Sequence, residues 1–362
     1  MSGQGHGQGH GQDHDILFIP GPTEVCPEVR AALALPQVGH RMPECKELLA
    51  SVRRKLAPLF ATTQHVLLES CPATGLMEAA IRNLVPERSL HLTCGAFSER
   101  WHKLARACGR KADAAAVAWG QANDEEALAA ALAAKSYDAV CVTHNETSTG
   151  VMNPLARLAS VVREQQPDAL VLVDTVSSLA GAPVDFDAVG LDLAFASTQK
   201  CLALPGGATV YAMSERAIER ARSVPARGWL LDFVRALEGL DVGNSVATPS
   251  IPHLYALDLQ LDRIAVEGID ARYARHLAMA ERTRAWVAEQ GLTMFGDAHF
   301  LSPTVACINA GDLDVADLVQ RVRQEGFVIG NGYGPLKGKT FRIGHMGDHS
   351  VEMLAQLLAA MS

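Results

Sequence analysis

The feature that most constrains the fold is a regular alternation, from His65 onward, of short apolar runs with longer amphipathic stretches. The apolar runs have the length of strands and are rich in Val, Leu and Ala: HVLLES, SLHLTC, DAVCVTH, ALVLVDT, DLAFAST and ATVYAM. Segments of helix length lie between most of them, such as GLMEAAIRNLV, FSERWHKLARACG, NDEEALAAALAA and LARLASVVREQQ. Because strands that alternate with helices form βαβ units, the pattern predicts a mainly parallel sheet. Strands that are apolar on both faces further predict helices on both sides of it.

The pattern changes near residue 245. The stretch from Pro252 to Gln290 predicts one or two long helices with a break at Gly268, and shorter strand–helix units follow it to the end. At about 150 residues per domain, a chain of 362 residues suggests two domains. We predict a large α/β domain (30–249), a smaller α+β domain (250–362), a bridging segment (16–29) and a disordered Gly/His-rich tail (1–15).

The composition argues against several classes of binding partner. The net charge is -8 and no block of Lys or Arg occurs, which argues against nucleic acid and against an anionic membrane surface. No apolar run approaches the roughly 20 residues that span a bilayer, and the start lacks the apolar core of a signal peptide. Eight scattered cysteines without a CxxC pair are typical of reduced, mostly buried thiols, so a cytoplasmic location is expected. His6, His10 and His14 could chelate a metal weakly, but we predict no metal site.

Small and polar residues follow five of the predicted strands. These segments are CPATGLMEAA, GAFSERW, NETSTG, the aspartate that ends ALVLVD, and Thr198-Gln199-Lys200 after DLAFAS. Each has an ordinary alternative, since small-residue loops are often tight turns, a terminal aspartate is often a cap, and a single lysine is usually a solvated charge. However, all five would meet at the carboxyl edge of one sheet, which is where open parallel sheets bind ligands.

Pyridoxal phosphate (PLP) is the cofactor whose chemistry needs this set. A phosphate binds at a helix N-terminus, which the Ala73-Thr74-Gly75 turn supplies, and Phe97 can stack on a flat ring. The protonated pyridine nitrogen calls for a buried carboxylate, Asp174. The aldehyde calls for an amine whose pKa is lowered by burial, so we predict Lys200 as the Schiff-base lysine.

With these residues in place, the chain resembles the class V aminotransferases of the fold-type I PLP enzymes. It is most like the alanine–glyoxylate and serine–glyoxylate (serine–pyruvate) branch. The matching stretches run in order along the chain: IPGPTEVCPEV (19–29), VGHRMPE (38–44), ATGLMEAA (73–80), GAFSERW (95–101), THNETSTGVMNP (143–154), LVDTVSSLAG (172–181), STQK (197–200), TPSIPHLYAL (248–257) and FRIGHMG (341–347).

The resemblance implies a role for each matched position. Lys200 would bind the cofactor as an aldimine in a ping-pong mechanism and shuttle a proton, and Asp174 would pair with the pyridinium. The remaining implied contacts are Phe97 and Val176 on the two ring faces, Thr147 near the ring hydroxyl, Ala73, Thr74, Gly75 and Gln199 on the phosphate, Gly21 and Arg342 on the substrate, and Thr248 from the other subunit of a homodimer with shared active sites.

Some positions depart from the family pattern. Pro72 stands where a serine or threonine is common, Ser245 stands where a tyrosine from the partner subunit is often found, and Trp229 replaces another tyrosine. These changes affect the expected details of phosphate binding rather than the fold.

The resemblance implies transfer of an amino group from a small amino acid, such as alanine or serine, to a 2-oxo acid such as glyoxylate or pyruvate. The alternative on the same fold is a PLP-dependent lyase or desulfurase. Those relatives stack a histidine on the ring and carry a cysteine on a late loop, whereas this chain has Phe97 and no cysteine in 327–347. A nicotinamide enzyme is disfavoured because no strand is followed by GxGxxG. Arg41 would favour a second negative charge on the substrate if it faced the site.

Overall fold

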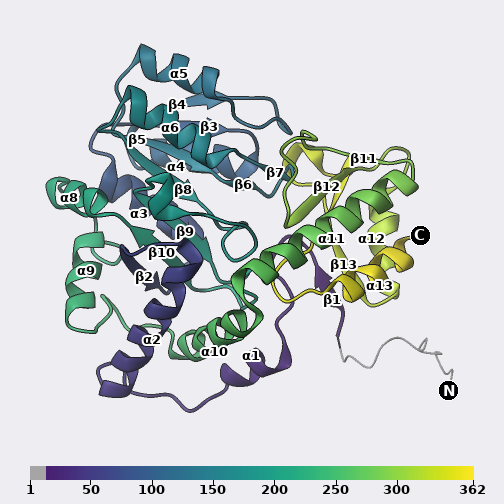
Figure 1. Cartoon of the computed structure of the whole chain (residues 1–362), viewed down its shortest axis with the longest axis horizontal. Coiled ribbons are helices and arrows are strands. Elements are labelled where there is room, and N and C mark those ends of the chain that lie inside the picture. Colours follow the sequence, from purple (N-terminus) through teal and green to yellow (C-terminus); the bar gives the residue numbers. More distant parts are fainter. Residues whose placement is uncertain (1–13) are drawn as a thin grey trace.

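The computed structural model describes residues 14–362 and is built on a seven-stranded sheet (Figure 1). The strand order is β2-β10-β9-β8-β5-β3-β4, and every pair is parallel except those made by β10, which runs antiparallel to β2 and β9. The strands are β2 (His65–Glu69), β3 (Arg88–Thr93), β4 (Lys111–Ala116), β5 (Ala139–Thr143), β8 (Leu170–Asp174), β9 (Leu193–Ser197) and β10 (Thr209–Met213). The predicted mainly parallel sheet is confirmed. Because β2 and β9 run in the same direction, the carboxyl ends of β2, β3, β5, β8 and β9 meet at one edge.

Helices cover both faces of this sheet, as predicted. Along β8, Val171 and Val173 pack in one apolar core, and Leu170 and Leu172 pack in a second core on the opposite face. The first core is completed by helices α2 (Pro43–Phe60), α5 (Glu125–Ala134), α6 (Leu155–Gln165) and α10 (Ile251–Glu267). The second is completed by α3 (Ala73–Leu84), α4 (Ala96–Ala107), α8 (Glu215–Ser223) and α9 (Phe233–Asp241).

A smaller mixed sheet contains the C-terminal strands and the first strand of the described chain. Its order is β1-β13-β14-β12-β11, with β1 parallel to β13 and the other pairs antiparallel. These strands are β1 (Ile16–Phe18), β11 (Thr293–Met294), β12 (Val305–Asn309), β13 (Phe327–Asn331) and β14 (Thr340–Gly344). Its core includes side chains of α11 (Ile269–Glu289), α12 (Val315–Gln324) and α13 (Val351–Met361).

Shorter elements connect these parts: α1 (Pro27–Ala32), the hairpin β6 (Asn145–Glu146) and β7 (Val151–Met152), α7 (Phe186–Val189) and the 3-10 turn η1 (Gly334–Leu336). The expected break between two long helices is confirmed at Gly268, whose φ of 82° separates α10 from α11. The domain boundaries at residues 30 and 250 stay a prediction, and α10 contributes Leu254 and Leu257 to the core of the large sheet.

The segment that follows β1 connects the small sheet to the predicted site. Thr23 N donates to Gln199 O at 3.1 Å, and Thr23 Oγ1 donates to Met346 O at 3.3 Å. The carbonyl oxygen of Pro20 accepts a hydrogen bond from Lys200 Nζ. Residues 16–23 therefore contact both the segment that follows β9 and the C-terminal part of the chain.

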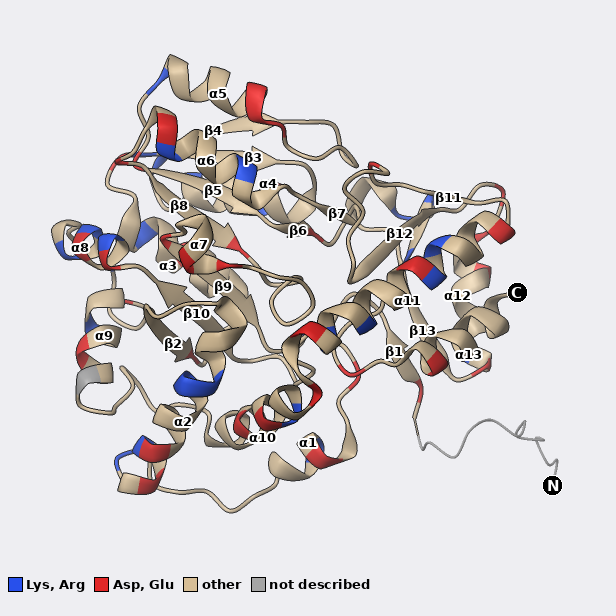
Figure 2. Cartoon of the chain, viewed as in Figure 1, with Lys and Arg blue, Asp and Glu red and all other residues tan. Residues whose placement is uncertain are grey.

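Figure 2 shows acidic and basic residues interspersed along helices such as α2, α8 and α11. Within residues 14–362, no helix combines the length and the apolar character needed to cross a membrane. The expectations for His6, His10 and the tail before residue 14 lie outside the described residues, and His14 Nε2 lies 2.8 Å from Glu24 Oε1.

Candidate active site

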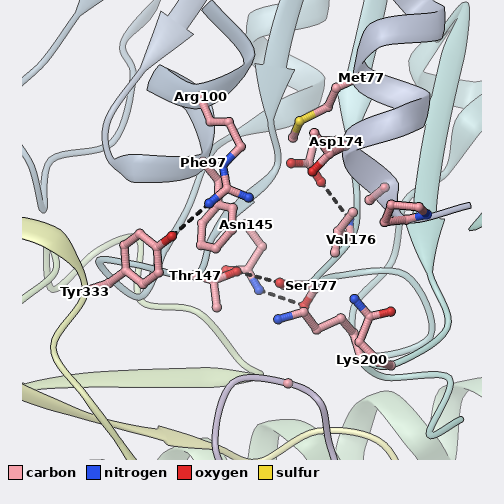
Figure 3. A pocket seen from close by; sticks show the side chains of 15 residues that line it. Met77, Phe97, Arg100, Asn145, Thr147, Asp174, Val176, Ser177, Lys200 and Tyr333 are labelled. Carbon is pink, nitrogen blue, oxygen red and sulfur yellow. Dashed lines mark hydrogen bonds between the residues drawn. The ribbon is translucent and has the colours of Figure 1, made fainter. Parts of the chain in front are cut away.

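A cavity of about 290 Å³ opens at the carboxyl edge of the large sheet (Figure 3). Nine of the residues predicted from the sequence line it: Gly21, Ala73, Thr74, Phe97, Thr147, Asp174, Val176, Gln199 and Lys200. Three predicted residues, Gly75, Thr248 and Arg342, are not among the lining residues. The structure therefore brings most of the predicted set together.

Lys200 lies three residues beyond the end of β9 and is 8% exposed. Its Nζ donates to the carbonyl oxygen of Pro20. Burial, and after it the positive charge of Arg342, lower the pKa of this amine to about 8. A lysine with this pKa is in part neutral near pH 8 and can act as a nucleophile or a base there.

Gly21 allows the close approach of the N-terminal segment to this lysine. Its φ is 89°, a conformation that favours glycine, and a Cβ atom there would lie 2.5 Å from Lys200 Cδ and 2.6 Å from Nζ. Any larger residue at position 21 would therefore displace the lysine side chain.

Asp174 is the last residue of β8 and is 4% exposed. Among the described residues, its carboxylate accepts one hydrogen bond, from Val176 N to Oδ1 at 2.9 Å. Burial raises the pKa of this carboxyl to about 7, only in part offset by that hydrogen bond. A cationic ligand beside Asp174 would keep the carboxyl ionised.

Glu146 fixes the start of α4 and with it Phe97. This buried carboxylate accepts from Phe97 N at 3.1 Å, Ser98 N at 3.0 Å and Ser148 Oγ at 2.6 Å, so it occupies the helix N-terminus. At the preceding position, Gly95, a Cβ atom would lie 2.5 Å from Glu146 Cγ, so glycine leaves room for this carboxylate. The ring of Phe97 then lines the cavity.

Polar groups from β6, from Thr147 directly after it, and from the loop after β8 line the cavity. Thr147 Oγ1 lies 2.6 Å from Ser177 Oγ, and Asn145 Nδ2 donates to Ser177 O at 2.8 Å (Figure 3). Asn145 Oδ1 is buried and has no hydrogen-bond partner among residues 14–362. Asn145 and Ser177 were not predicted individually, although both belong to polar stretches that follow strands.

The N-terminus of α3 supplies the predicted phosphate turn. No side chain caps this helix, whose N-cap is Pro72, so the first backbone N–H groups at Ala73 and Thr74 remain open to an anion. Gly75 N instead donates to Pro72 O at 2.8 Å. Gln199 is held by a 2.7 Å hydrogen bond from Ser197 Oγ. Thr248 is exposed in the single chain, so its predicted contact with a second subunit stays a prediction.

Arg342 lies in β14 and contacts two residues that line the cavity, Thr147 and Tyr333. Its Nε donates to Asn331 O at 3.0 Å, Nη1 donates to Thr147 O at 3.4 Å, and its guanidinium carbon lies 5.5 Å from the ring centre of Tyr333. Burial lowers its pKa. Tyr333, Arg100 and Met77 line the cavity and were missed from the sequence. Arg100 lies in the GAFSERW stretch, which follows a predicted strand, so the sequence pattern could have indicated it. Tyr333 lies in a glycine-rich loop, where no sequence pattern indicated a site residue.

Other reactive side chains lie away from this set. His345 and His349 are in a loop, and residues 14–362 hold no cluster of His, Cys, Asp or Glu suited to a metal. Cys201 is buried, and burial raises the pKa of its thiol to about 11, so it is unreactive near neutral pH. Arg41 is exposed and is not among the residues that line the cavity.

Three comparisons place this arrangement among known proteins. Residues 31–336 match the family described as aminotransferase class-V. A solved alanine–glyoxylate aminotransferase from Nostoc sp. is 30% identical, with a TM-score of 0.91 over 97% of this chain and 95% of the other. A solved aspartate aminotransferase of subgroup IV from Thermus thermophilus is 32% identical, with a TM-score of 0.89 over 96% and 97%. The serine–glyoxylate aminotransferase of Arabidopsis thaliana is 30% identical, over 95% of this chain and 88% of that relative.

The large, mainly parallel sheet with a smaller mixed sheet is thus the fold of the fold-type I PLP aminotransferases. The cavity at its carboxyl edge, with a buried lysine and a buried aspartate, fits that class. The chain belongs to the aminotransferase class-V family and is an aminotransferase. Membership in the family implies PLP as the cofactor.

Proposed function

We propose that the protein is a PLP-dependent aminotransferase that moves an amino group from a small amino acid, such as alanine or serine, to a 2-oxo acid such as glyoxylate or pyruvate. The observation that carries this proposal is the pairing, in one cavity, of a buried lysine with a lowered pKa and a buried aspartate with a raised one. Relatives with 30% or more identity that are named for alanine–glyoxylate and serine–glyoxylate transfer support the choice of substrates.

The lining residues fit the proposed cofactor. The open N–H groups of α3 suit a phosphate, and Phe97 and Val176 offer apolar contacts for a flat ring. Asp174, with one carboxylate oxygen that has no donor among residues 14–362, suits a protonated ring nitrogen. When bound, PLP supplies an aldehyde that carries the amino group and a ring that withdraws electrons. The residues named here would hold it.

The chain's own residues then perform the proton transfers and the positioning. Lys200 Nζ is the base that removes the proton from the substrate Cα and returns it, which its lowered pKa permits. Asp174 keeps a proton on the ring nitrogen through its negative charge. Arg342 is proposed to bind the carboxylate that the amino acid and the 2-oxo acid share, because a guanidinium binds a carboxylate through two parallel hydrogen bonds.

The alternative of a lyase or desulfurase receives no support from the cavity. Among residues 14–362, Phe97 lines the cavity, and no histidine and no cysteine does.

Borohydride reduction tests the proposal. The purified protein should absorb in the visible, the absorbance should disappear on reduction, and mass spectrometry should find the cofactor attached to Lys200. Lys200→Ala should lose turnover with every donor, whereas the matched variant Lys337→Ala, at an exposed lysine, should keep it. Attachment at Lys337 or Lys339, or the absence of any cofactor, would contradict the assignment. A panel of amino donors with glyoxylate and pyruvate then tests the substrates.

A further inference from the structure

Arg100 is a cation in the cavity for which the proposed reaction so far has no use. It lies on α4, one turn after Phe97, and its guanidinium carbon is 4.9 Å from the centre of the Phe97 ring. Its Nη2 donates to the hydroxyl of Tyr333 at 2.8 Å (Figure 3). Within residues 14–362, Arg100 forms no salt bridge.

The charges around Arg100 leave it without a counterion. The charged residues that line the cavity are Arg100, Lys200 and Asp174, and the proposed function assigns Asp174 to the cofactor ring. The nearby carboxylate of Glu146 is already bonded to backbone N–H groups and serine hydroxyls at the start of α4. A partly buried guanidinium without an anion is costly, so this side of the cavity favours a negatively charged group on the ligand.

Arg100 and Arg342 are joined through one tyrosine. Arg342 lies over the ring of Tyr333, with 5.5 Å between its guanidinium carbon and the ring centre, and Arg100 donates to the hydroxyl of the same residue. The ring of Tyr333 also packs against Phe97, with 5.4 Å between ring centres. Two guanidinium groups therefore contact Tyr333, Arg342 over the ring and Arg100 at the hydroxyl, and neither has a carboxylate partner in the described chain.

A substrate with two carboxylates would satisfy both groups. We propose that Arg100, oriented by Tyr333, binds the side-chain carboxylate of a dicarboxylic amino donor, such as aspartate, while Arg342 binds its α-carboxylate. This inference rests on the proposed function and narrows it: among small amino donors, those with an acidic side chain are preferred. The sequence suggested Arg41 as the residue that would favour a second negative charge on the substrate, and this proposal gives that role to Arg100.

The steady-state test compares aspartate with alanine as donors to glyoxylate, in the wild-type holoenzyme and in Arg100→Met. Wild type should have the larger kcat/KM with aspartate, and the ratio of aspartate to alanine kcat/KM should fall on the order of 100-fold in Arg100→Met, as for loss of one buried charged contact. Arg106→Met, an exposed arginine on the same helix, is the control and should leave the ratio unchanged. Tyr333→Phe should raise KM for aspartate more than it lowers kcat, because it loosens Arg100 without removing its charge.

Binding of unreactive acids gives a second readout that does not depend on turnover. By calorimetry, succinate should bind the wild-type holoenzyme at least tenfold more tightly than butyrate, and Arg100→Met should abolish that difference.

The proposal would be overturned if Arg100→Met left the ratio of aspartate to alanine kcat/KM unchanged or lowered kcat/KM equally with both donors. A weaker affinity of this variant for PLP would also overturn it, because that result would assign Arg100 to the cofactor. These results would leave the proposed function standing. Absence of transamination with every donor, together with absence of a cofactor on Lys200, would instead refute the proposed function itself.

Discussion

Replacing Asp174 with asparagine should make the cofactor-free protein more stable while destroying its activity. The carboxyl is 4% exposed, and burial raises its pKa from an ordinary 3.8 to about 7. Above pH 7 the folded protein without cofactor must hold a buried carboxylate whose one hydrogen bond comes from Val176 N. Asparagine keeps the shape and an oxygen that can accept this bond, but it carries no charge.

The pKa shift sets the magnitude and its pH dependence. Three pKa units correspond to about 4 kcal/mol, because each unit is worth about 1.4 kcal/mol. The folded pKa is raised, so the folded state binds more protons than the unfolded state between pH 3.8 and 7, and the stability of wild type falls as pH rises through this window. Asp174→Asn has no carboxyl at this position and therefore does not lose this stability as the pH rises. Its advantage should be small near pH 4 and reach its ceiling above pH 7.

Thermal unfolding of the cofactor-free proteins measures this difference. With an unfolding entropy of about 0.8 kcal/mol/K for a chain of this length, 4 kcal/mol corresponds to an increase in Tm of about 5 °C at pH 8. Asp187→Asn is the control and should lower Tm at pH 8. Hydrogen bonds from Thr62 and Thr63 lower the pKa of Asp187, so its ionised form stabilises the folded protein. With PLP added, wild type should have the higher Tm of the two proteins, because only wild type has the negative charge of Asp174 that the pyridinium compensates. A Tm for Asp174→Asn at or below that of wild type at pH 8, or a difference that does not grow between pH 5 and 8, would refute the reasoning.

Three further substitutions test other parts of the site. Gly21→Ala places a methyl group 2.5 Å from Lys200 Cδ, so we expect a kcat at least tenfold lower and a smaller fraction of lysine-bound cofactor by absorbance. Unchanged absorbance spectra would contradict this prediction, because they would show that the backbone around residue 21 moves away without displacing the lysine. Glu146→Ala leaves the N–H groups of Phe97 and Ser98 without an acceptor and should lower Tm by about 4–6 °C, which corresponds to about 3–5 kcal/mol; a loss below 1 °C would contradict its role at α4. Arg342→Lys should raise KM for donor and acceptor alike and lower kcat/KM by about 2–4 kcal/mol, with cofactor absorbance intact; if both KM values stay at the wild-type level, the carboxylate is bound elsewhere.

The parts of the site that local pattern predicts are those at the ends of buried strands. All five residues of β8 and of β9 are buried, so the apolar runs and their ends at Asp174 and Ser197 are visible in the sequence. Residues that follow such strands must meet at one edge of a parallel sheet, whatever the details of packing. The convergence of Lys200, Asp174 and Phe97 on one cavity follows from this topology.

The parts that local pattern does not predict depend on contacts between distant segments. Tyr333 contacts Arg100 across 233 positions of the chain, and nothing near either residue signals the other. Strand β4 reads KADAAA, an alanine-rich edge strand without the branched residues that favour strands, and it was not predicted. Arg342 was expected on the substrate, yet two of its nitrogens donate to the carbonyls of Asn331 and Thr147, which only the packing of β14 determines.

The pairing of β1 with β13 has a consequence for biosynthesis. Ile16 lies opposite Phe327, so β1 is translated more than 300 residues before its partner exists. Until then Pro20 and Gly21, which close the cavity beside Lys200, have no sheet to hold them, and Tyr333 has not been translated. A nascent chain that stops before Phe327 contains every strand of the large sheet but cannot complete the pocket. The active site therefore cannot form until Tyr333 has been translated, which happens after every strand of the large sheet.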